Sequence, residues 1–154
     1  MELRQLRSET DRQMFAKRLA EARATRGFGF KDCTGARLGD AHLTFGDLYA
    51  IYEDESSPAE TMQAGFAVHN LATLPQSYPQ PDLTHIPPQY VLEGGELWSL
   101  SPGAGRIARL VAAAIAGIMQ ARAILIYAIA EPVDIRRFYL EDGFSDIGSL
   151  VEWP

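Results

Sequence analysis

ELWSLSPGAGR at residues 96–106 and FYLEDGF at residues 138–144 enclose the part of the sequence that decides the fold. A pattern with helical period lies between them at residues 107–118, and the continuous apolar run AILIYAIA follows at residues 123–130. This order predicts a strand at GELWSLS (95–101), a long helix, a second strand and a short helix. Because a strand, a crossover helix and a strand imply a parallel pair, we expect a parallel strand-helix-strand unit.

The long helix carries six apolar residues at helical spacing, which predict a broad stripe packed against the sheet. They are Ile107, Leu110, Val111, Ala114, Ile115 and Ile118. The run at 123–130 is typical of a strand that is covered on both faces. Residues 132–140 predict a short helix, with Gly143 as its left-handed C-cap and Phe144 packing back onto it.

The first half of the chain predicts one amphipathic helix and several antiparallel strands. A short strand at residues 3–6 precedes Ser8 and Asp11, whose spacing is that of a helix N-cap. The helix runs to about Arg26. Its inner side is formed by Phe15, Leu19 and Ala22. In the region that follows, a period of two predicts antiparallel strands. They are residues 41–45, 48–53 and 62–71.

These elements together predict an α/β fold with a mixed, mostly antiparallel central sheet, flanking helices and the parallel unit. A length of 154 residues is enough for one substantial core, so we expect a single domain over residues 1–154. Residues 72–95 break all periodicity and hold five of the nine prolines. We interpret them as an ordered excursion over the surface, because aromatic and aliphatic residues are interleaved with the prolines.

The composition predicts a globular protein that binds neither nucleic acid nor membranes. The formal net charge of −6 disfavours unspecific binding to nucleic acid or anionic lipid and favours cationic or amine partners. The one cysteine, Cys33, cannot form an intramolecular disulfide, which is compatible with a reducing compartment. Residues 110–119 form the longest apolar stretch, too short for a bilayer, and the first residues lack a signal-peptide pattern. We therefore expect a cytoplasmic protein.

The sequence does not point to a metal site or to a serine hydrolase. The three histidines are scattered without metal-ligand spacing, so no metal is predicted. They are His42, His69 and His85. A histidine on a strand is more often structural than a base, so each stays a secondary candidate for a base. Ser99 and Ser101 lack the G-x-S-x-G pattern that a serine nucleophile of that class requires.

The turn SPGAG at residues 101–105 opens the long helix and is a candidate anion site. The first N–H groups of a helix have no partner inside the helix, and they attract phosphate oxygens. Gly103 and Gly105 let the backbone approach a diphosphate, and Arg106 and Arg109 could add charge-assisted contacts. The alternative is a tight turn without a ligand, with both arginines on a solvated face.

Residues 96–144 resemble the core of the GCN5-related N-acetyltransferase superfamily, as a divergent member. Members carry a strand, a Gly-x-Gly or Gly-x-Ala turn that opens a long helix, a second strand, and a helix ending in a pattern like F-Y-x-x-x-G-F. The corresponding residues are GELWSLS, Gly103-Ala104-Gly105, AILIYAIA and 138–144. The resemblance implies an acyl-CoA-dependent N-acyltransferase that transfers an acetyl group from acetyl-CoA to a primary amine by direct attack.

The resemblance also implies which residues take part. The cofactor-binding residues would be Leu100, Ser101, Gly103, Ala104, Gly105 and Arg106. Tyr139 falls where members place a tyrosine near the coenzyme A sulfur, and it is the candidate general acid. Its alternative is a half-buried core aromatic beside Phe138. Glu96 is the candidate base, and its alternative is a solvated glutamate at a strand edge. The acceptor would be a small-molecule or peptide amine, and the resemblance allows a homodimer.

Two departures from the superfamily pattern leave other functions open. Leu100 stands where members have Arg or Gln, and only Ser101 and Pro102 separate it from the glycine turn. A protein that keeps this fold as a binding or interaction module, without catalysis, is therefore the alternative. A third reading is an acyltransferase for a longer acyl chain. The excursion at 72–95 would set acceptor specificity, cover a sheet edge or build a dimer contact.

Overall fold

The structure is a computed structural model, and it describes residues 1–26, 46–70, 72, 86–126 and 135–145. In these segments one five-stranded sheet has the strand order β1-β2-β3-β4-β5. The strands are β1 (Glu2–Leu6), β2 (Asp47–Tyr52), β3 (Ala64–Asn70), β4 (Val91–Ser99) and β5 (Ala123–Ile126). The helices are α1 (Glu9–Arg26), α3 (Ala104–Ile118) and α4 (Ile135–Glu141), with 3-10 turns η1 (Ala59–Thr61) and η3 (Pro88–Tyr90).

The sheet is antiparallel except for its last pair. β1 pairs with β2, β2 with β3 and β3 with β4 in antiparallel register. β4 and β5 are parallel, from Val91 opposite Ala123 to Gly94 opposite Ile126, and α3 is the crossover between them. The predicted α/β class is therefore confirmed, with a mixed, mostly antiparallel sheet and one parallel strand-helix-strand unit.

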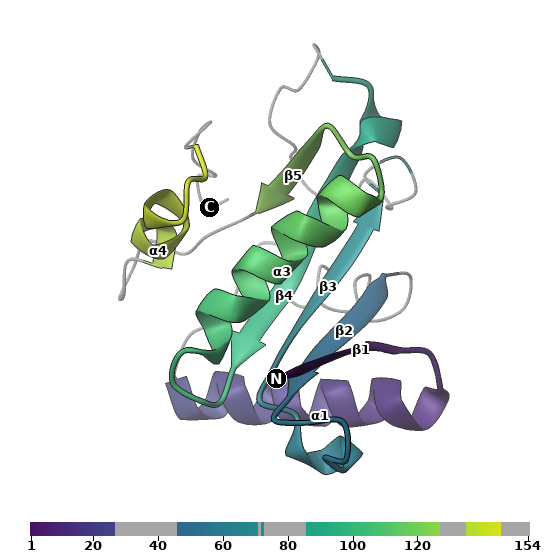
Figure 1. The fold of residues 1–154 in the computed structure, drawn as a ribbon, viewed down its shortest axis with the longest axis vertical. Coiled ribbons are helices and arrows are strands. Elements are labelled where there is room, and N and C mark those ends of the chain that lie inside the picture. The colour runs from purple at the N-terminus through teal and green to yellow at the C-terminus, as the bar shows by residue number, and fades with distance from the viewer. Residues whose placement is uncertain (27–45, 71, 73–85, 127–134, 146–154) are drawn as a thin grey trace, which may run out of the picture.

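α1 and α3 lie on opposite faces of the sheet (Figure 1). Successive side chains of a strand point to opposite faces. In β2, accordingly, Leu48 and Ala50 belong to the core cluster of α1, whereas Ile51 belongs to the cluster of α3. Two apolar layers thus cover the sheet, and the predicted inner side of α1 is confirmed. Its buried residues include Phe15, Leu19 and Ala22.

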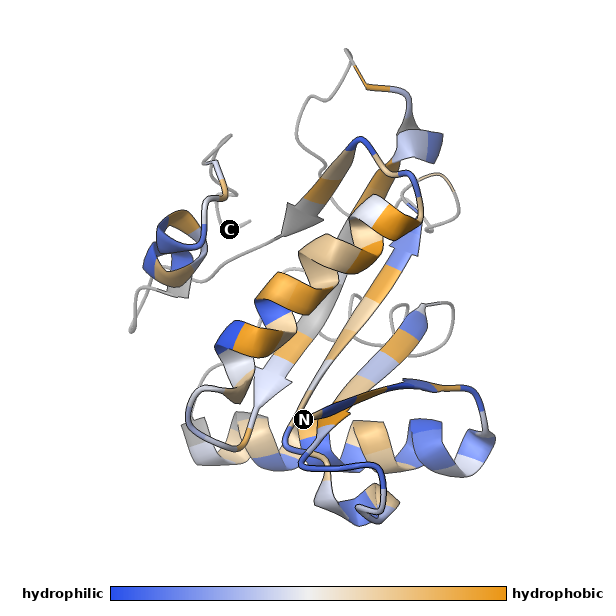
Figure 2. Ribbon diagram, viewed as in Figure 1, coloured by the Kyte–Doolittle hydropathy of each residue, from blue (hydrophilic) through white to orange (hydrophobic). Residues whose placement is uncertain are grey.

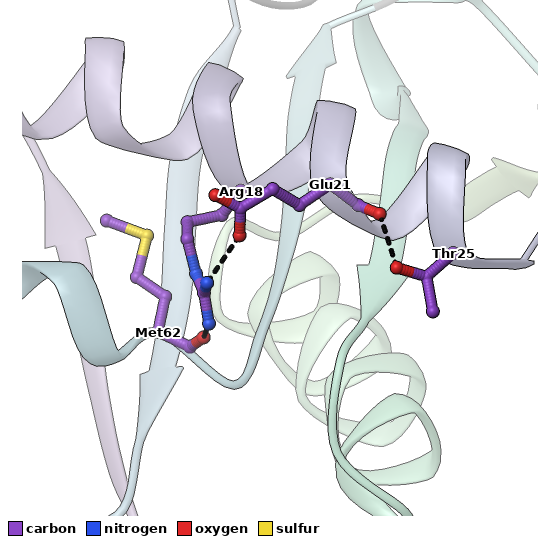
Figure 3. A network of polar contacts seen from close by, with 4 residues as sticks. All are labelled: Arg18, Glu21, Thr25 and Met62. Carbon is purple, nitrogen blue, oxygen red and sulfur yellow. Dashed lines mark hydrogen bonds and ion pairs between the residues drawn. The ribbon is translucent and has the colours of Figure 1, made fainter.

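Local polar contacts hold α1 in place. Ser8 Oγ accepts a hydrogen bond from the Asp11 N–H at 3.1 Å, which is the predicted N-cap. Further along, the Arg18 guanidinium pairs with Glu21 and donates to the Met62 carbonyl oxygen at 3.1 Å (Figure 3). Since Met62 lies two residues before the start of β3, the Arg18 hydrogen bond links α1 to the beginning of that strand. The Thr25 hydroxyl donates to the Glu21 carbonyl at 2.9 Å.

The face that α3 turns to the sheet agrees with the predicted stripe only in part. Its buried residues are Ala104, Ala108, Ala112, Ile115 and Ala116. The stripe is confirmed at Ile115, Ile107 and Val111, which lie in or against the core cluster. It was wrong at Leu110, which is 45% exposed, and at Ile118, which is 81% exposed. Tyr49 and Phe66 stack with ring centroids 5.3 Å apart in the same core cluster, so small alanines fit against the sheet. Figure 2 shows apolar colour over most of α3, interrupted by hydrophilic positions near its N-terminal end. The other predicted residues are partly buried (Ile107, Val111) or exposed (Ala114).

The boundaries of β4 differ from the expectation. β4 begins at Val91 rather than at residue 95, because Val91 and Leu92 pair with β5 and are buried. Residues 91–95 of the predicted excursion at 72–95 are therefore strand, and the strand ends at Ser99. Several predicted segments lie outside the described residues. They are the strand at 41–45, residues 73–85 of the excursion, residues 127–130 of the apolar run and residues 132–134 of the short helix.

Candidate functional site

Two glycines form the junction between β4 and α3, one for its backbone conformation and the other for its close approach to β4. Gly103 is the N-cap residue of α3 and has φ 81° and ψ −25°, a left-handed conformation that favours glycine. Gly105 lies against β4, where an added Cβ would stand 3.3 Å from Ser99 Cβ. No atom lies within 4 Å of the Cβ position at Gly103, so the backbone there is open on that side.

The backbone amides of this junction divide into occupied and open ones. Ala104 N–H donates to the Ser101 carbonyl at 3.3 Å, and that carbonyl also accepts from Ser99 Oγ at 2.8 Å. Among the described residues, no carbonyl accepts from the amides of Gly103, Gly105 or Arg106. Three amides at the start of α3 are therefore available to an anion, where the helix dipole also favours negative charge.

Leu100 takes no part in this group of open amides. Its N–H donates to the Gln63 carbonyl at 2.8 Å. Its side chain is partly buried and packs against the core cluster on the α1 face. Leu100, which the resemblance implied as a cofactor-binding residue, thus has both its N–H and its side chain engaged by the protein.

The pairing of β4 with β3 is irregular next to the junction. Gly65 pairs with Trp98 and Ala67 pairs with Gly95, so Glu96 and Leu97 together face one residue of β3 and form a β-bulge. The described pairing of β4 with β5 ends at Gly94. A bulge leaves backbone groups unpaired and re-aims side chains, often near functional sites. Glu96, the candidate base, lies in this bulge, and its side chain is outside what the structure describes.

Tyr139 lies at the end of α4 and is 7% exposed. Gly143 has φ 94°, which confirms the predicted left-handed C-cap, and the Phe144 N–H donates to the Tyr139 carbonyl at 3.0 Å. The Phe144 ring packs edge-on against the Tyr139 ring with centroids 5.3 Å apart. Burial raises the pKa of Tyr139 to about 12, while Arg109 lowers it and Asp142 raises it. The phenol therefore stays protonated at neutral pH.

An ion pair that the sequence reasoning missed joins α3 to the end of α4. Arg109 Nε donates to Asp142 Oδ2 at 2.7 Å, and the two side chains are 12% and 5% exposed. Arg106 Nε donates to the other carboxylate oxygen at 3.3 Å, and its side chain is 71% exposed. The hydrogen bond from Arg109 is the main cause that lowers the pKa of Asp142. The carboxylate is therefore ionised at neutral pH.

Arg109 extends from the first turns of α3 to the tyrosine ring of α4. Its Nη1 is 4.0 Å from the Cβ position at Gly105, and its guanidinium carbon is 5.5 Å from the ring centroids of both Phe138 and Tyr139. The sequence reasoning read Arg109 as a contact for a diphosphate and did not single out Asp142. The available signal was one acidic residue just before the C-cap glycine and two arginines three residues apart on α3.

The remaining candidates add no further chemistry to this region. His69 is buried in β3, and His42 and His85 lie outside the described residues. In the segments that the structure describes, no group of three or more His, Cys, Asp or Glu side chains could hold a metal ion. No helix in the same segments combines the length and the hydropathy that crossing a bilayer requires.

Solved structures of acetyltransferases share this fold over nearly the whole chain. The ribosomal-protein-alanine N-acetyltransferase from Brucella melitensis biovar Abortus 2308 matches with TM-score 0.62 and 14% identity, over 99% of this chain and 97% of that one. A predicted acetyltransferase from Clostridium acetobutylicum, with acetyl-CoA, matches with TM-score 0.61 and 13% identity, over 99% and 95%. An acetyltransferase from Trypanosoma brucei matches with TM-score 0.57 and 12% identity, over 99% and 98%.

The chain therefore shares its fold with these solved acetyltransferases, as the resemblance predicted. Identities of 12–14% mean that its sequence has diverged far from these structures. No protein family matches the sequence, and no curated protein does.

Proposed function

We propose that the protein is an acyl-CoA-dependent N-acyltransferase, which transfers an acetyl group from acetyl-CoA to a primary amine by direct attack. The observation that carries the proposal is the junction of β4 and α3, where the amides of Gly103, Gly105 and Arg106 donate to no carbonyl of the described residues. Arg109, in the next turn of the same helix, lies 5.5 Å from the Tyr139 ring centroid. The shared fold with acetyltransferases, one of them with acetyl-CoA, supports the same reaction class. Fold alone does not define an activity, so the site carries the argument.

The open groups suit the parts of an acyl-CoA molecule. The diphosphate would lie at the three amides, where unpaired N–H groups and the helix dipole attract anionic oxygens. The amide groups of the pantetheine arm would pair with backbone groups of β4 at the bulge of Glu96 and Leu97, since a bulge leaves backbone groups unpaired and extended amide chains bind such strands. The thioester would then lie beside the bulge at Glu96.

The reaction that we propose has three parts: attack on the thioester with loss of the thiolate, removal of a proton from the amine nitrogen, and stabilisation of the thiolate. The nitrogen of a neutral amine attacks the thioester carbonyl, and the tetrahedral oxyanion collapses with loss of the coenzyme A thiolate. Glu96, directly or through water, takes the proton that the nitrogen loses. Tyr139 donates to the departing sulfur. Because its pKa of about 12 lies above the roughly 8.5 of a thiol, the phenol acts first as a hydrogen-bond donor to the thiolate.

A ligand titration tests the proposal. Any ligand that binds only the native state raises the unfolding midpoint, by about 5 to 10 °C at a hundredfold excess over Kd. We expect acetyl-CoA to raise the midpoint and Gly103→Ala to remove the rise, because alanine strains the left-handed turn. Gly117→Ala is the matched control, since Gly117 lies in the same helix with no atom near its Cβ position.

The titration also separates the alternatives. No midpoint shift with acetyl-CoA, longer acyl-CoA molecules or free coenzyme A at millimolar concentration would overturn the proposal. A midpoint shift only with long-chain acyl-CoA molecules would replace acetyl transfer by transfer of a longer acyl chain as the proposed function.

The second candidate function is a binding or interaction module that keeps the fold without catalysis. Leu100 favours it, because its amide and side chain are both engaged by the protein and add nothing to a diphosphate site. Turnover of acetyl-CoA with any primary amine excludes this candidate. Binding of free coenzyme A without turnover across a panel of small and peptide amines supports it.

A further inference from the structure

The partly buried ion pair between Arg109 and Asp142 joins α3 to the end of α4 within the candidate site. We propose that Arg109, held by Asp142, is a positioning residue that fixes the Tyr139 phenol against the first turns of α3. The inference rests on the proposed function for its effect on turnover, but the positioning itself can be measured on the protein without substrate.

The contacts of Arg109 show why it can set this geometry. Its Nε is directed by the 2.7 Å hydrogen bond to Asp142, which belongs to the same turn as the C-cap of α4. A guanidinium is planar, so one directed bond also orients the face that meets the aromatic rings. That face is 5.5 Å from the Tyr139 centroid, while Nη1 lies 4.0 Å from the Cβ position at Gly105. Arg109 therefore lies against the tyrosine ring of α4 while its own backbone belongs to the first turns of α3.

The partly buried position of the pair favours a role in positioning side chains over a role in overall stability. Removing two charges from water is expensive, and apolar residues of similar size often stabilise a protein as well as a buried pair does. Arg106 binds the same carboxylate from a position 71% exposed, so the acid already has an exposed partner. The covered Arg109 is the member of this group that reaches the phenol. Among the described groups, Arg109 from α3 and Asp142 at the end of α4 are the charges that act on Tyr139.

The first experiment measures the ionisation of Tyr139 without substrate. Ultraviolet titration of each protein, minus the same protein with Tyr139→Phe, isolates this phenol. We expect Asp142→Asn to lower its pKa, because the substitution removes an anion that raises the pKa and leaves Arg109 unneutralised. Arg137→Gln is the matched control, since Arg137 also lies over Phe138, at 5.2 Å, but its side chain is 63% exposed. We expect it to leave the Tyr139 pKa unchanged.

The second experiment separates kcat from KM in the full chain. Misplacement of the phenol is expected to lower kcat about tenfold to hundredfold in Arg109→Gln and in Asp142→Asn, with KM for acetyl-CoA within about twofold. The double variant is expected to be no worse than either single variant, because both remove the same interaction. Arg109→Lys keeps the charge without the planar fork and is expected to restore only part of kcat.

Several outcomes overturn the inference. A lower unfolding midpoint with unchanged Tyr139 pKa and unchanged kcat would show that the pair is merely structural. A higher KM for acetyl-CoA with unchanged kcat would show that Arg109 contacts the diphosphate instead. If Arg109→Gln does not fold, Arg109→Lys and Asp142→Glu are measured in its place under the same criteria. If the native protein neither binds nor turns over acyl-CoA, the proposed function fails, while the Tyr139 titration still decides whether the ion pair acts on the Tyr139 side chain.

Discussion

Arg18 on α1 and Arg109 on α3 each form an ion pair, and the two pairs differ in what they connect. Arg18 pairs with Glu21 three residues along its own helix, and the side chains are 25% and 41% exposed. Arg109 pairs with Asp142, 33 residues further along the chain, with side chains 12% and 5% exposed. A partly exposed local pair reinforces one helix, whereas a covered long-range pair sets how two elements lie relative to each other.

Removing the Tyr139 hydroxyl should give the largest effect of the changes considered. It tests whether the tyrosine next to the Arg109 pair has a catalytic role that a tyrosine on the α1 face lacks. Tyr139→Phe keeps the ring packing but removes the donor to the departing sulfur, so kcat is expected to fall about a hundredfold or more. The thermal shift with acetyl-CoA should remain. Tyr52→Phe is the control on the α1 face, because Tyr52 is also buried and has Arg4 3.9 Å above its ring. Equal turnover in both variants would remove Tyr139 from its role.

Alkaline pH tests the burial of Tyr139 without a substitution in the Arg109 pair. The pKa of Tyr139 is raised from 10.0 to about 12 by burial. An unfolded tyrosine ionises near pH 10, so this stabilisation is complete below pH 10 and is lost as the pH rises through about 12. The loss should be roughly 2 to 3 kcal/mol, measured as the difference in urea unfolding between the native protein and Tyr139→Phe. Parallel stability curves for the two proteins would contradict the expected burial.

Asp142→Asn and Glu21→Gln compare the two ion pairs directly. Asp142→Asn leaves a covered guanidinium without its anion, and we expect the free energy of unfolding to fall by about 2 kcal/mol, between the values for exposed and deeply buried pairs. Glu21→Gln should lower it by less than about 0.5 kcal/mol, since that pair is local and partly exposed. Urea unfolding at neutral pH measures both. Equal losses would mean that burial does not distinguish the two regions.

Much of the fold could be predicted because its signals are local. The Ser8 cap, the inner side of α1 and the Gly143 C-cap each depend on residues within a few positions of one another. The face of α3 could be predicted only in part in this way, since Ile107, Val111 and Ile115 pack in or against the core cluster but Leu110 and Ile118 are exposed. It depends on Tyr49 and Phe66, which belong to other strands and occupy the space that larger helix residues would need. A hydrophobic pattern shows that a helix is buried but not how large its partners are.

The candidate site shows the same division. The glycine turn and the FYLEDGF pattern were visible as sequence motifs, and the structure connects them through Arg109. The pairing of Arg109 with Asp142 spans 33 residues, so no local rule predicts it. Leu100 was equally hidden, because its environment is made by Gln63 and by the cluster under α1. Partners distant in sequence decide what these side chains can do.

Arg106→Gln should give the smallest effect and tests whether burial alone separates the pairs. Arg106 and Arg109 donate to opposite oxygens of one carboxylate, so they share a partner and differ mainly in exposure, 71% against 12%. We expect Arg106→Gln to change the free energy of unfolding by less than about 0.5 kcal/mol and to leave the Tyr139 pKa unchanged, because water already screens this contact. Urea unfolding and ultraviolet titration beside Arg109→Gln provide the measurement. If the two variants lose equal stability, the charge on Asp142 matters more than the buried geometry of its partner, and the distinction between local and positioning arginines disappears.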